Sequence, residues 1–346
     1  MNLKGRNVNL DLLKLIACFC VLGLHTFGIN IPKTSFSYMI LYYLCGMAVP
    51  LFMFSSGYIL LNRFNDTISI TNIYIYIYRK FLNIFKVIFF WGLIGFFAID
   101  LLKYMNGNII NFKYGFITPF VDLVKDVLQK GTMWHFWYFG ALSIVYIVLP
   151  VLVKICQKPH GKIRLWLILV IISVTIQIIS YFMRSSFQLK IIQTFRIWTW
   201  LQYFLLGGIF GEYKDKITNR CGMYKRVIAL IIFSTAWVAW QITAGKHLLN
   251  DLHAEYFYDD AITIAVTSIF SSLILSLKLS EPIKQQIESF VGLSMTVYII
   301  HPLILFILTH FIGNNELILF ILLTISSFLL AFIIKKIKLF DFFLKL

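Results

Sequence analysis

The sequence predicts an all-α fold, a polytopic helical bundle that spans a membrane, and three observations support this prediction. Of the 346 residues, 60% are hydrophobic and only 13% are charged, which is about half the charged fraction of a soluble domain. The apolar residues form long runs, close to the roughly 20 residues that an α-helix needs to cross a bilayer. Lys and Arg gather in the segments between these runs.

Ten candidate spans follow from the apolar runs, at residues 10–30, 37–61, 81–102, 134–154, 165–183, 197–212, 227–244, 258–277, 292–312 and 316–334. The sixth is short and the eighth opens with two aspartates, so these two match the pattern least well. With ten spans, 20 of the 31 Lys and Arg residues lie on the side of the N-terminus and 9 on the other side. Because cytoplasmic loops collect Lys and Arg, this bias predicts that both termini are cytoplasmic.

We expect residues 1–346 to form one membrane domain, with no soluble domain. The longest polar stretch, residues 103–133, is too short to fold alone, and its alternating charges suit a short helix on the outer surface. The formal net charge of +16 is typical of membrane topology rather than of nucleic-acid binding, since no nucleic-acid-binding motif is present.

The five cysteines indicate neither a metal site nor a disulfide framework. Their number is odd, no CxxC motif occurs, and most lie in or beside apolar runs, so small core residues are the simpler interpretation. Residues 15–18 look like a lipoprotein cleavage box. However, the apolar run continues to Ile29, where a signal peptide should already have ended. We therefore expect an uncleaved first span.

The first span carries two ionisable residues, Lys14 and His25, eleven positions apart. An α-helix brings both side chains to within about 20° of the same face, separated by about 16 Å along the axis. Ionisable groups inside a span are costly, which makes them candidates for function. Lys14 also fits a snorkelling side chain at the inner boundary, with Asp11 as its ion-pair partner. His25 could equally have a structural role, as a histidine that packs against a neighbouring helix and forms a hydrogen bond with it.

The second span contains a proline followed by small polar residues. Pro50 predicts a kink that frees backbone groups, which the Ser55 or Ser56 hydroxyl can satisfy. Gly57 permits a close approach of another helix. Such a kink would serve helix packing, shape a ligand groove, or do both.

Four motifs follow one another along the chain. They are the opening of the first span from Arg6 to Lys14 ahead of His25, VPLFMFSSGY at residues 49–58, WHFWY at residues 134–138 with Tyr146 and Pro150 behind it, and SMTVYIIHP at residues 294–302. Gly207 and Gly208 fit a fifth, weaker pattern. In this order and spacing the chain resembles the acyltransferase 3 family of integral membrane acyltransferases. The resemblance covers residues 6–302. It implies that an acetyl or other short acyl group moves from acyl-CoA to a hydroxyl of a cell-surface or lipid-linked glycan.

The resemblance implies that His25 acts as a general base toward the hydroxyl or accepts the acyl group itself. No cofactor is bound permanently, because acyl-CoA is a substrate, and its candidate contacts are Lys14, Ser56, Arg79 and Lys80. One departure concerns the family's Arg-x-x-Arg pair before the third span, which here becomes Lys80 followed by Asn83. A neutral amide cannot hold a phosphate as a guanidinium does. Arg79 and Lys86 would then compensate, or the donor is bound differently.

Two further groups of residues are candidates for the acceptor side. His135 and Trp137 of the fourth span and Tyr298 and His301 of the ninth would hold the glycan, although an interfacial aromatic belt and a packed histidine explain them as well. A carboxylate would orient His25, but Asp11 is about 21 Å away along the same helix. Asp100, Asp259 and Asp260 remain, of which we favour Asp260, and a plain helix-start acid is the alternative.

Two other classes of function remain open. Polar residues inside spans also mark transport paths, and some relatives in the family are associated with polysaccharide export or serine uptake. The internal repeat of many transporters is not visible here. A sensor or an assembly partner in an envelope complex is the third class. In each case the sequence predicts a multi-pass protein of the plasma membrane, and it leaves the oligomeric state open.

Overall fold

The computed structural model describes residues 6–31, 33–64, 70–105, 117–220, 222–337, 340 and 342–344, and these residues contain helices but no strand. The α-helices are α1 (Val8–Phe27), α2 (Phe36–Cys45), α3 (Ala48–Arg63), α4 (Ile70–Met105), α5 (Thr118–Val127), α6 (Trp137–Cys156), α7 (Gly161–Phe182), α8 (Ile197–Arg220), α9 (Met223–Ala244), α10 (Ala261–Leu275), α11 (Glu281–Val291), α12 (Ser294–Ile312) and α13 (Glu316–Lys336). Short 3-10 turns join some of them, at η2 (Trp134–Phe136), η3 (Phe187–Leu189), η4 (Gln193–Phe195) and η6 (Ala254–Tyr256). A π-helical turn, η5 (Gly245–Leu249), extends α9.

Helix α1 begins with a side-chain cap and continues without interruption through Cys18. The Asn7 side-chain oxygen accepts the Leu10 N–H at 3.3 Å, which satisfies one of the free amides of the first turn. The helix ends at Gly28, whose N–H donates to the Leu24 carbonyl at 3.2 Å. Cys18 is buried in the middle of this helix.

Within the described residues, eight helical segments are long and apolar enough to cross a membrane. They correspond to eight of the ten predicted spans. The two predicted spans at 197–212 and 258–277 form the helices α8 and α10, but neither is among the described helices that are both long enough and apolar enough to cross a membrane. Helix α10 has 15 residues, about 22 Å, which is shorter than the roughly 30 Å hydrocarbon core.

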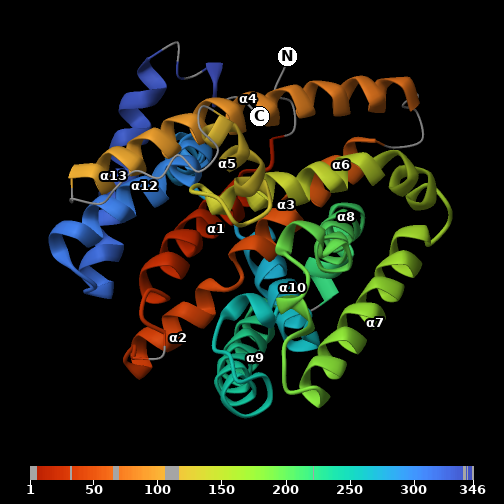
Figure 1. Cartoon of the computed structure of the whole chain (residues 1–346). Coiled ribbons are helices and arrows are strands. Elements are labelled where there is room, and N and C mark those ends of the chain that lie inside the picture. Colours follow the sequence, from red (N-terminus) through yellow and green to blue (C-terminus); the bar gives the residue numbers. More distant parts are fainter. Residues whose placement is uncertain are drawn as a thin grey trace.

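The outer faces of the peripheral helices are apolar. Phe182 of α7, Tyr224 of α9 and Phe311 of α12 are exposed to 85%, 77% and 77%, and Figure 1 places α7 and α9 away from the centre of the bundle. Soluble monomers rarely expose apolar surface on this scale. These faces are therefore suited to contact lipid, which confirms the predicted helical membrane bundle.

The second predicted span consists of two helices, α2 and α3, separated by Gly46 and Met47. The prediction that Pro50 causes the kink is wrong, because the chain bends before it. Pro50 lies in the first turn of α3, where amides have no helical partner, so its missing N–H removes no hydrogen bond.

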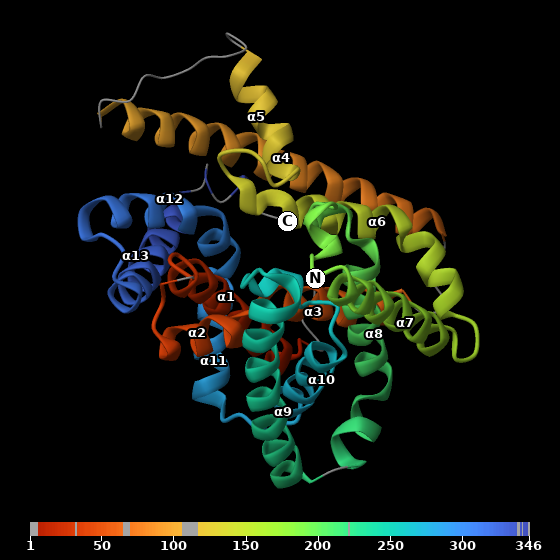
Figure 2. The same ribbon diagram turned by 60° about the horizontal axis from the view of Figure 1, so that its bottom comes forward.

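Helix α3 packs most extensively against α8 and also against α1, and Figure 2 shows it between these two helices. Two glycines allow the contact with α8. A Cβ atom at Gly57 would overlap the Phe204 carbonyl oxygen, and one at Gly207 would overlap the Phe54 carbonyl oxygen. The close helix approach predicted at Gly57 is therefore confirmed.

Helix α4 starts at Ile70, well before the predicted third span, and runs along one side of the bundle beside α5 and α6 (Figures 1 and 2). Arg79 and Lys80, which the prediction placed in a loop, consequently lie inside a helix. Helix α5 forms the short helix expected between the third and fourth spans, while Lys113 of that stretch lies outside the described residues.

Candidate active site

A cavity of about 300 Å³ lies beside the outer half of α1, and we name it the histidine cavity. Helices α1, α2, α3, α6 and α12 and the segments before α8 and α10 contribute to its wall. The side chains that line it are Val21, Leu24, His25, Gly28, Ile29, Tyr42, Val49, Trp134, His135, Trp137, Gln193, His253, Glu255, Tyr258 and Tyr298.

Three imidazole rings from distant parts of the sequence meet at this cavity. The His25 ring stacks on the His301 ring with centroids 5.1 Å apart, and the His135 ring meets His301 edge to face at 5.2 Å. Trp134 contacts His25 edge to face at 4.9 Å. The rings stack rather than converge on one point. Within the described residues, no group of three or more His, Cys, Asp or Glu side chains could hold a metal ion.

His301 supports His25 from behind the cavity wall. It is fully buried and does not line the cavity. Its Nδ1 lies 2.7 Å from the Tyr298 carbonyl oxygen, so this nitrogen carries the proton and donates. His301 Nε2 then has a free lone pair, and no partner for it exists among the described residues.

A second cavity, of about 380 Å³, lies toward the start of α1, and we name it the basic cavity. Among the described residues, three cationic side chains and no carboxylate line it. The lining consists of Lys14, Phe52, Ser55, Ser56, Ile59, Leu60, Arg63, Tyr76, Lys80, Tyr138, Leu142, Tyr146, Ser294, Met295 and Tyr298. The Ser55 hydroxyl is buried and has no hydrogen-bond partner in the described part of the chain, so it is available to a ligand.

Tyr298 lines both cavities and is the one described residue that they share. Its hydroxyl donates to the His135 carbonyl oxygen at 2.5 Å. Its ring packs against Tyr138 and Phe139, with centroids 5.8 and 5.6 Å away. Tyr298 therefore contributes to the walls of both cavities, and its ring lies 5.9 Å from the His301 ring.

Lys14, Ser56 and Lys80, predicted as donor contacts, all line the basic cavity. Lys14 pairs with Asp11 at 3.2 Å, which confirms the ion pair predicted from their spacing. Arg79, also predicted, is exposed and does not line the cavity. Successive helical residues point about 100° apart, and of this pair Lys80 is the one that lines the cavity.

Arg63, at the end of α3, is the cation that the sequence analysis missed as a donor contact. Arg63 and Lys80 both lie over the Tyr76 ring, 5.2 and 5.6 Å from its centroid. Lys86, considered as a substitute for the arginine lost at Asn83, instead lies over the Phe342 ring at 4.4 Å. The cations that accompany Lys80 in the cavity are thus Lys14 and Arg63.

His135 and Trp137, two of the predicted acceptor contacts, line the histidine cavity together with Tyr298. Asp260 does not line it. Its carboxylate accepts hydrogen bonds from the Tyr181 hydroxyl at 2.6 Å and from the Trp240 indole at 3.1 Å, in a separate groove between α7, α9 and α10. The described carboxylate that does line the histidine cavity is Glu255.

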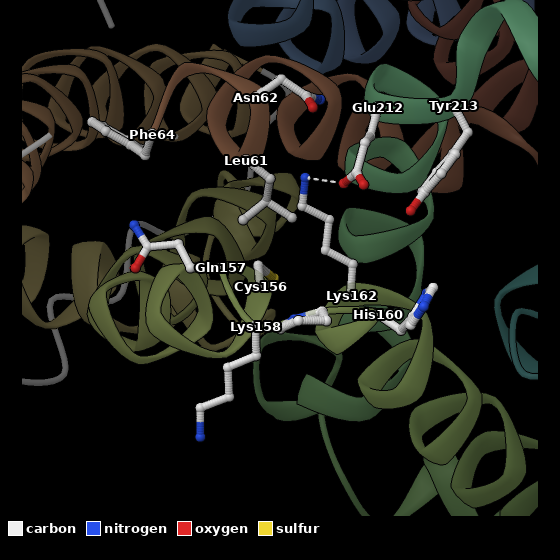
Figure 3. A pocket seen from close by; sticks show the side chains of 11 residues that line it. Leu61, Asn62, Phe64, Cys156, Gln157, Lys158, His160, Lys162, Glu212 and Tyr213 are labelled. Atoms are coloured by element: carbon white, nitrogen blue, oxygen red, sulfur yellow. Dashed lines mark ion pairs between the residues drawn. The ribbon is translucent and has the colours of Figure 1, made fainter. Parts of the chain in front are cut away.

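A third cavity, of about 420 Å³, lies among α3, α7 and α8 and shares no lining residue with the other two. Figure 3 shows the Lys162 ammonium reaching the Glu212 carboxylate, at 2.7 Å. None of the predicted site residues lines this cavity.

The fold and its paired cavities define a polytopic helical membrane protein with a polar site between its helices. The sequence matches the family model described as an acyltransferase domain over residues 7–336. The chain therefore belongs to this family, the acyltransferase 3 family that its motifs resemble.

One curated relative is similar over nearly the whole chain. It is an amino-acid racemase of Enterococcus faecalis, 24% identical over 356 residues, and the match covers 97% of this chain and 47% of the relative. The chain thus spans about half the length of that relative. No solved structure gives a significant match.

Proposed function

We propose that this protein transfers an acetyl or other short acyl group from acyl-CoA to a hydroxyl of a cell-surface or lipid-linked glycan in the plasma membrane. The observation that carries the proposal is that Tyr298 lines both the basic cavity and the histidine cavity. A donor in one cavity and an acceptor in the other would meet at this ring, next to the cluster of His25, His135 and His301.

The basic cavity is suited to the donor. Coenzyme A carries phosphates at one end and a thioester at the end of a long, flexible arm. Lys14, Arg63 and Lys80 would pair with the phosphates, and the Ser55 and Ser56 hydroxyls would contact the polar arm. The thioester would then reach Tyr298, and the basic residues would be on the side predicted to face the cytoplasm.

His25 would supply the chemistry. The acceptor oxygen attacks the thioester carbonyl, the hydroxyl proton moves to the neutral imidazole, and the carbon–sulfur bond breaks. The proton then passes to the departing thiolate, so the products are an ester and free coenzyme A. In the two-step alternative, the imidazole first takes the acyl group and then delivers it to the hydroxyl.

Tyr298 would act as a gate between donor and acceptor. The hydrogen bond from its hydroxyl to the His135 carbonyl oxygen would hold the ring in the wall that the two cavities share. Rotation of the side chain would join them when both substrates are bound. A closed gate would protect the thioester from water that enters the histidine cavity.

The test is His25→Ala in purified protein in lipid nanodiscs, with radiolabelled acetyl-CoA and candidate glycans. We expect transfer to fall by at least about 100-fold, as for loss of a general base. His310→Ala is the matched control, because His310 lies exposed at the end of α12. Unchanged transfer by His25→Ala would exclude the proposed role.

Transport is a second candidate function, and one observation favours it. The two cavities are lined from different parts of α1 and share Tyr298, which also suits a small polar substrate that crosses the membrane. The name of the relative, an amino-acid racemase, makes an amino acid the candidate substrate to test. Proteoliposomes distinguish the two functions. A transporter would accumulate labelled amino acid without acyl-CoA, whereas the acyltransferase would need acyl-CoA and would release free thiol.

A further inference from the structure

One segment that passes the histidine cavity is acidic, although the whole chain carries a net charge of +16. Four of the 15 acidic residues lie within positions 251–260, and no Lys or Arg occurs between Lys246 and Lys278. This segment passes the histidine cavity, where Glu255 and His253 line the wall. The basic cavity has the opposite composition, with three cations and no carboxylate.

Glu255 is held firmly at the cavity wall. Its carboxylate accepts a hydrogen bond from the Gln193 side-chain amide, which also lines the cavity. Its carbonyl oxygen accepts from Arg196 Nη1 at 3.2 Å. One residue earlier, the Ala254 N–H donates to the Tyr42 hydroxyl at 2.9 Å. The side chain therefore presents its charge to the cavity from a fixed backbone.

Two other charged groups lie near Glu255, and neither adds an unpaired positive charge to the described lining of the cavity. The Arg196 guanidinium is buried, donates to the backbone carbonyl oxygens of Gln188, Ile191 and Glu255, and does not line the cavity. His253 pairs with Asp251 at 2.6 Å, so this pair carries no net positive charge. No Lys or Arg is among the described residues that line the histidine cavity.

The other residues that line the cavity indicate the size and chemistry of the ligand. Trp134, Trp137 and Tyr258 provide aromatic faces, and Gln193 and the histidines provide hydrogen-bonding groups. A volume of about 300 Å³ is at the lower end of small-molecule sites, so it admits one ring rather than an oligosaccharide chain.

We infer that the histidine cavity binds an uncharged or amine-bearing alcohol of the size of one sugar unit, and that Glu255 selects it against acceptors that carry a carboxylate or phosphate. The inference names the acceptor class of the acyl transfer proposed above and rests on that function. Glu255 is a specificity-determining residue in this account. A like charge brought beside it would be repelled, whereas an amine would be attracted.

Three methyl glycosides of one ring type test the inference, namely methyl glucoside, methyl glucosaminide and methyl glucuronide. Their binding to the full-length protein in nanodiscs is measured by calorimetry, and each is then offered as acceptor with labelled acetyl-CoA. We expect the glucuronide to bind at least about tenfold more weakly than the glucoside, equivalent to about 1.4 kcal/mol. The glucosaminide should bind at least as well as the glucoside.

Glu255→Gln keeps an acceptor oxygen for Gln193 and removes only the charge. We expect this variant to reduce the difference in binding between glucoside and glucuronide to about threefold or less. Glu316→Gln is the matched control, because Glu316 accepts from the Thr34 hydroxyl and does not line the cavity. It should keep the tenfold difference.

The outcomes separate the inference from the proposed function. Equal binding of glucuronide and glucoside, no binding of any glycoside, or an unchanged ratio in Glu255→Gln would overturn the inference. The expected binding order without acyl transfer to any glycoside would support the ligand class and contradict the acyltransferase activity. Acyl transfer to all three glycosides without discrimination by charge would support the acyltransferase activity and contradict the inferred ligand class.

Discussion

Replacing Tyr298 by phenylalanine tests whether this ring separates donor from acceptor. The change removes one buried hydrogen bond, from the Tyr298 hydroxyl to the His135 carbonyl oxygen at 2.5 Å, and keeps the ring. Such a bond contributes about 1 kcal/mol, so the closed position of the ring should become about fivefold less favoured. We expect acetyl-CoA hydrolysis without acceptor to rise about fivefold relative to acyl transfer.

The assay is release of coenzyme A thiol by purified protein, with and without a glycan acceptor. Tyr203→Phe is the control, because the Tyr203 hydroxyl is also buried and donates to a carbonyl oxygen, that of Tyr258, at 2.7 Å, while its ring lines neither cavity. It should lower stability without changing the ratio of hydrolysis to transfer. An equal ratio of hydrolysis to transfer in Tyr298→Phe and in the unmodified protein would refute the proposal that Tyr298 acts as a gate.

Three further predictions concern charged residues. Lys80→Ala should raise KM for acetyl-CoA about tenfold in steady-state assays, since a charge-assisted bond contributes about 1.5–3 kcal/mol. Arg79→Ala is the control and should change KM less than about twofold. Equal effects of the two variants would contradict the placement of Lys80 in the donor site. Asp260→Asn should lower the free energy of unfolding by about 1–2 kcal/mol, measured by thermal melting, and leave catalysis intact. A loss of kcat with no change in the melting temperature would instead support Asp260 as a partner of His25. Burial raises the pKa of Asp126, a residue of α5, to about 7. The folded protein therefore keeps this carboxyl protonated at pH values where the unfolded chain, with a carboxyl pKa near 4, has released the proton. Stability should therefore fall as pH rises from about 4 to about 7, and Asp126→Asn should flatten this slope in melting curves.

The sequence was most informative about residues on one helix. Helical geometry alone placed Lys14 and His25 on one face at different depths, and α1 does contribute Lys14 to the basic cavity and His25 to the histidine cavity. The two predicted spans that fit least well are also the two helices, α8 and α10, that do not qualify as spans. These properties depend on local periodicity and composition, which a single sequence contains.

Residues brought together by tertiary packing were harder to predict. The contact of His25 with His301, which is 276 positions away, depends on how α1 and α12 pack. Glu255 lies in an irregular segment whose position is set by Arg196 and Tyr42, so no periodic pattern indicated it. Asp260 was considered because it lies near the outer end of a predicted span, but as the N-cap residue of α10 it bonds to Tyr181 and Trp240 instead.

Lys80 and Arg63 illustrate a related difficulty. Neighbouring cations in the sequence suggested that Arg79 and Lys80 act together, but a helix points them in different directions. Arg63 was counted only as an inner basic residue, because nothing local indicates that the end of α3 lies against Tyr76 on α4.

Photolabelling with an acyl-CoA that carries a diazirine in its acyl group tests the central claim most directly. The account predicts that the label, mapped by mass spectrometry, attaches at the junction of the two cavities, to Tyr298, His25 or Trp134, and that excess acetyl-CoA prevents it. Protected labelling confined to the third cavity, at Lys162 or Cys156, or to the groove beside Asp260 would contradict the claim that the thioester reaches His25.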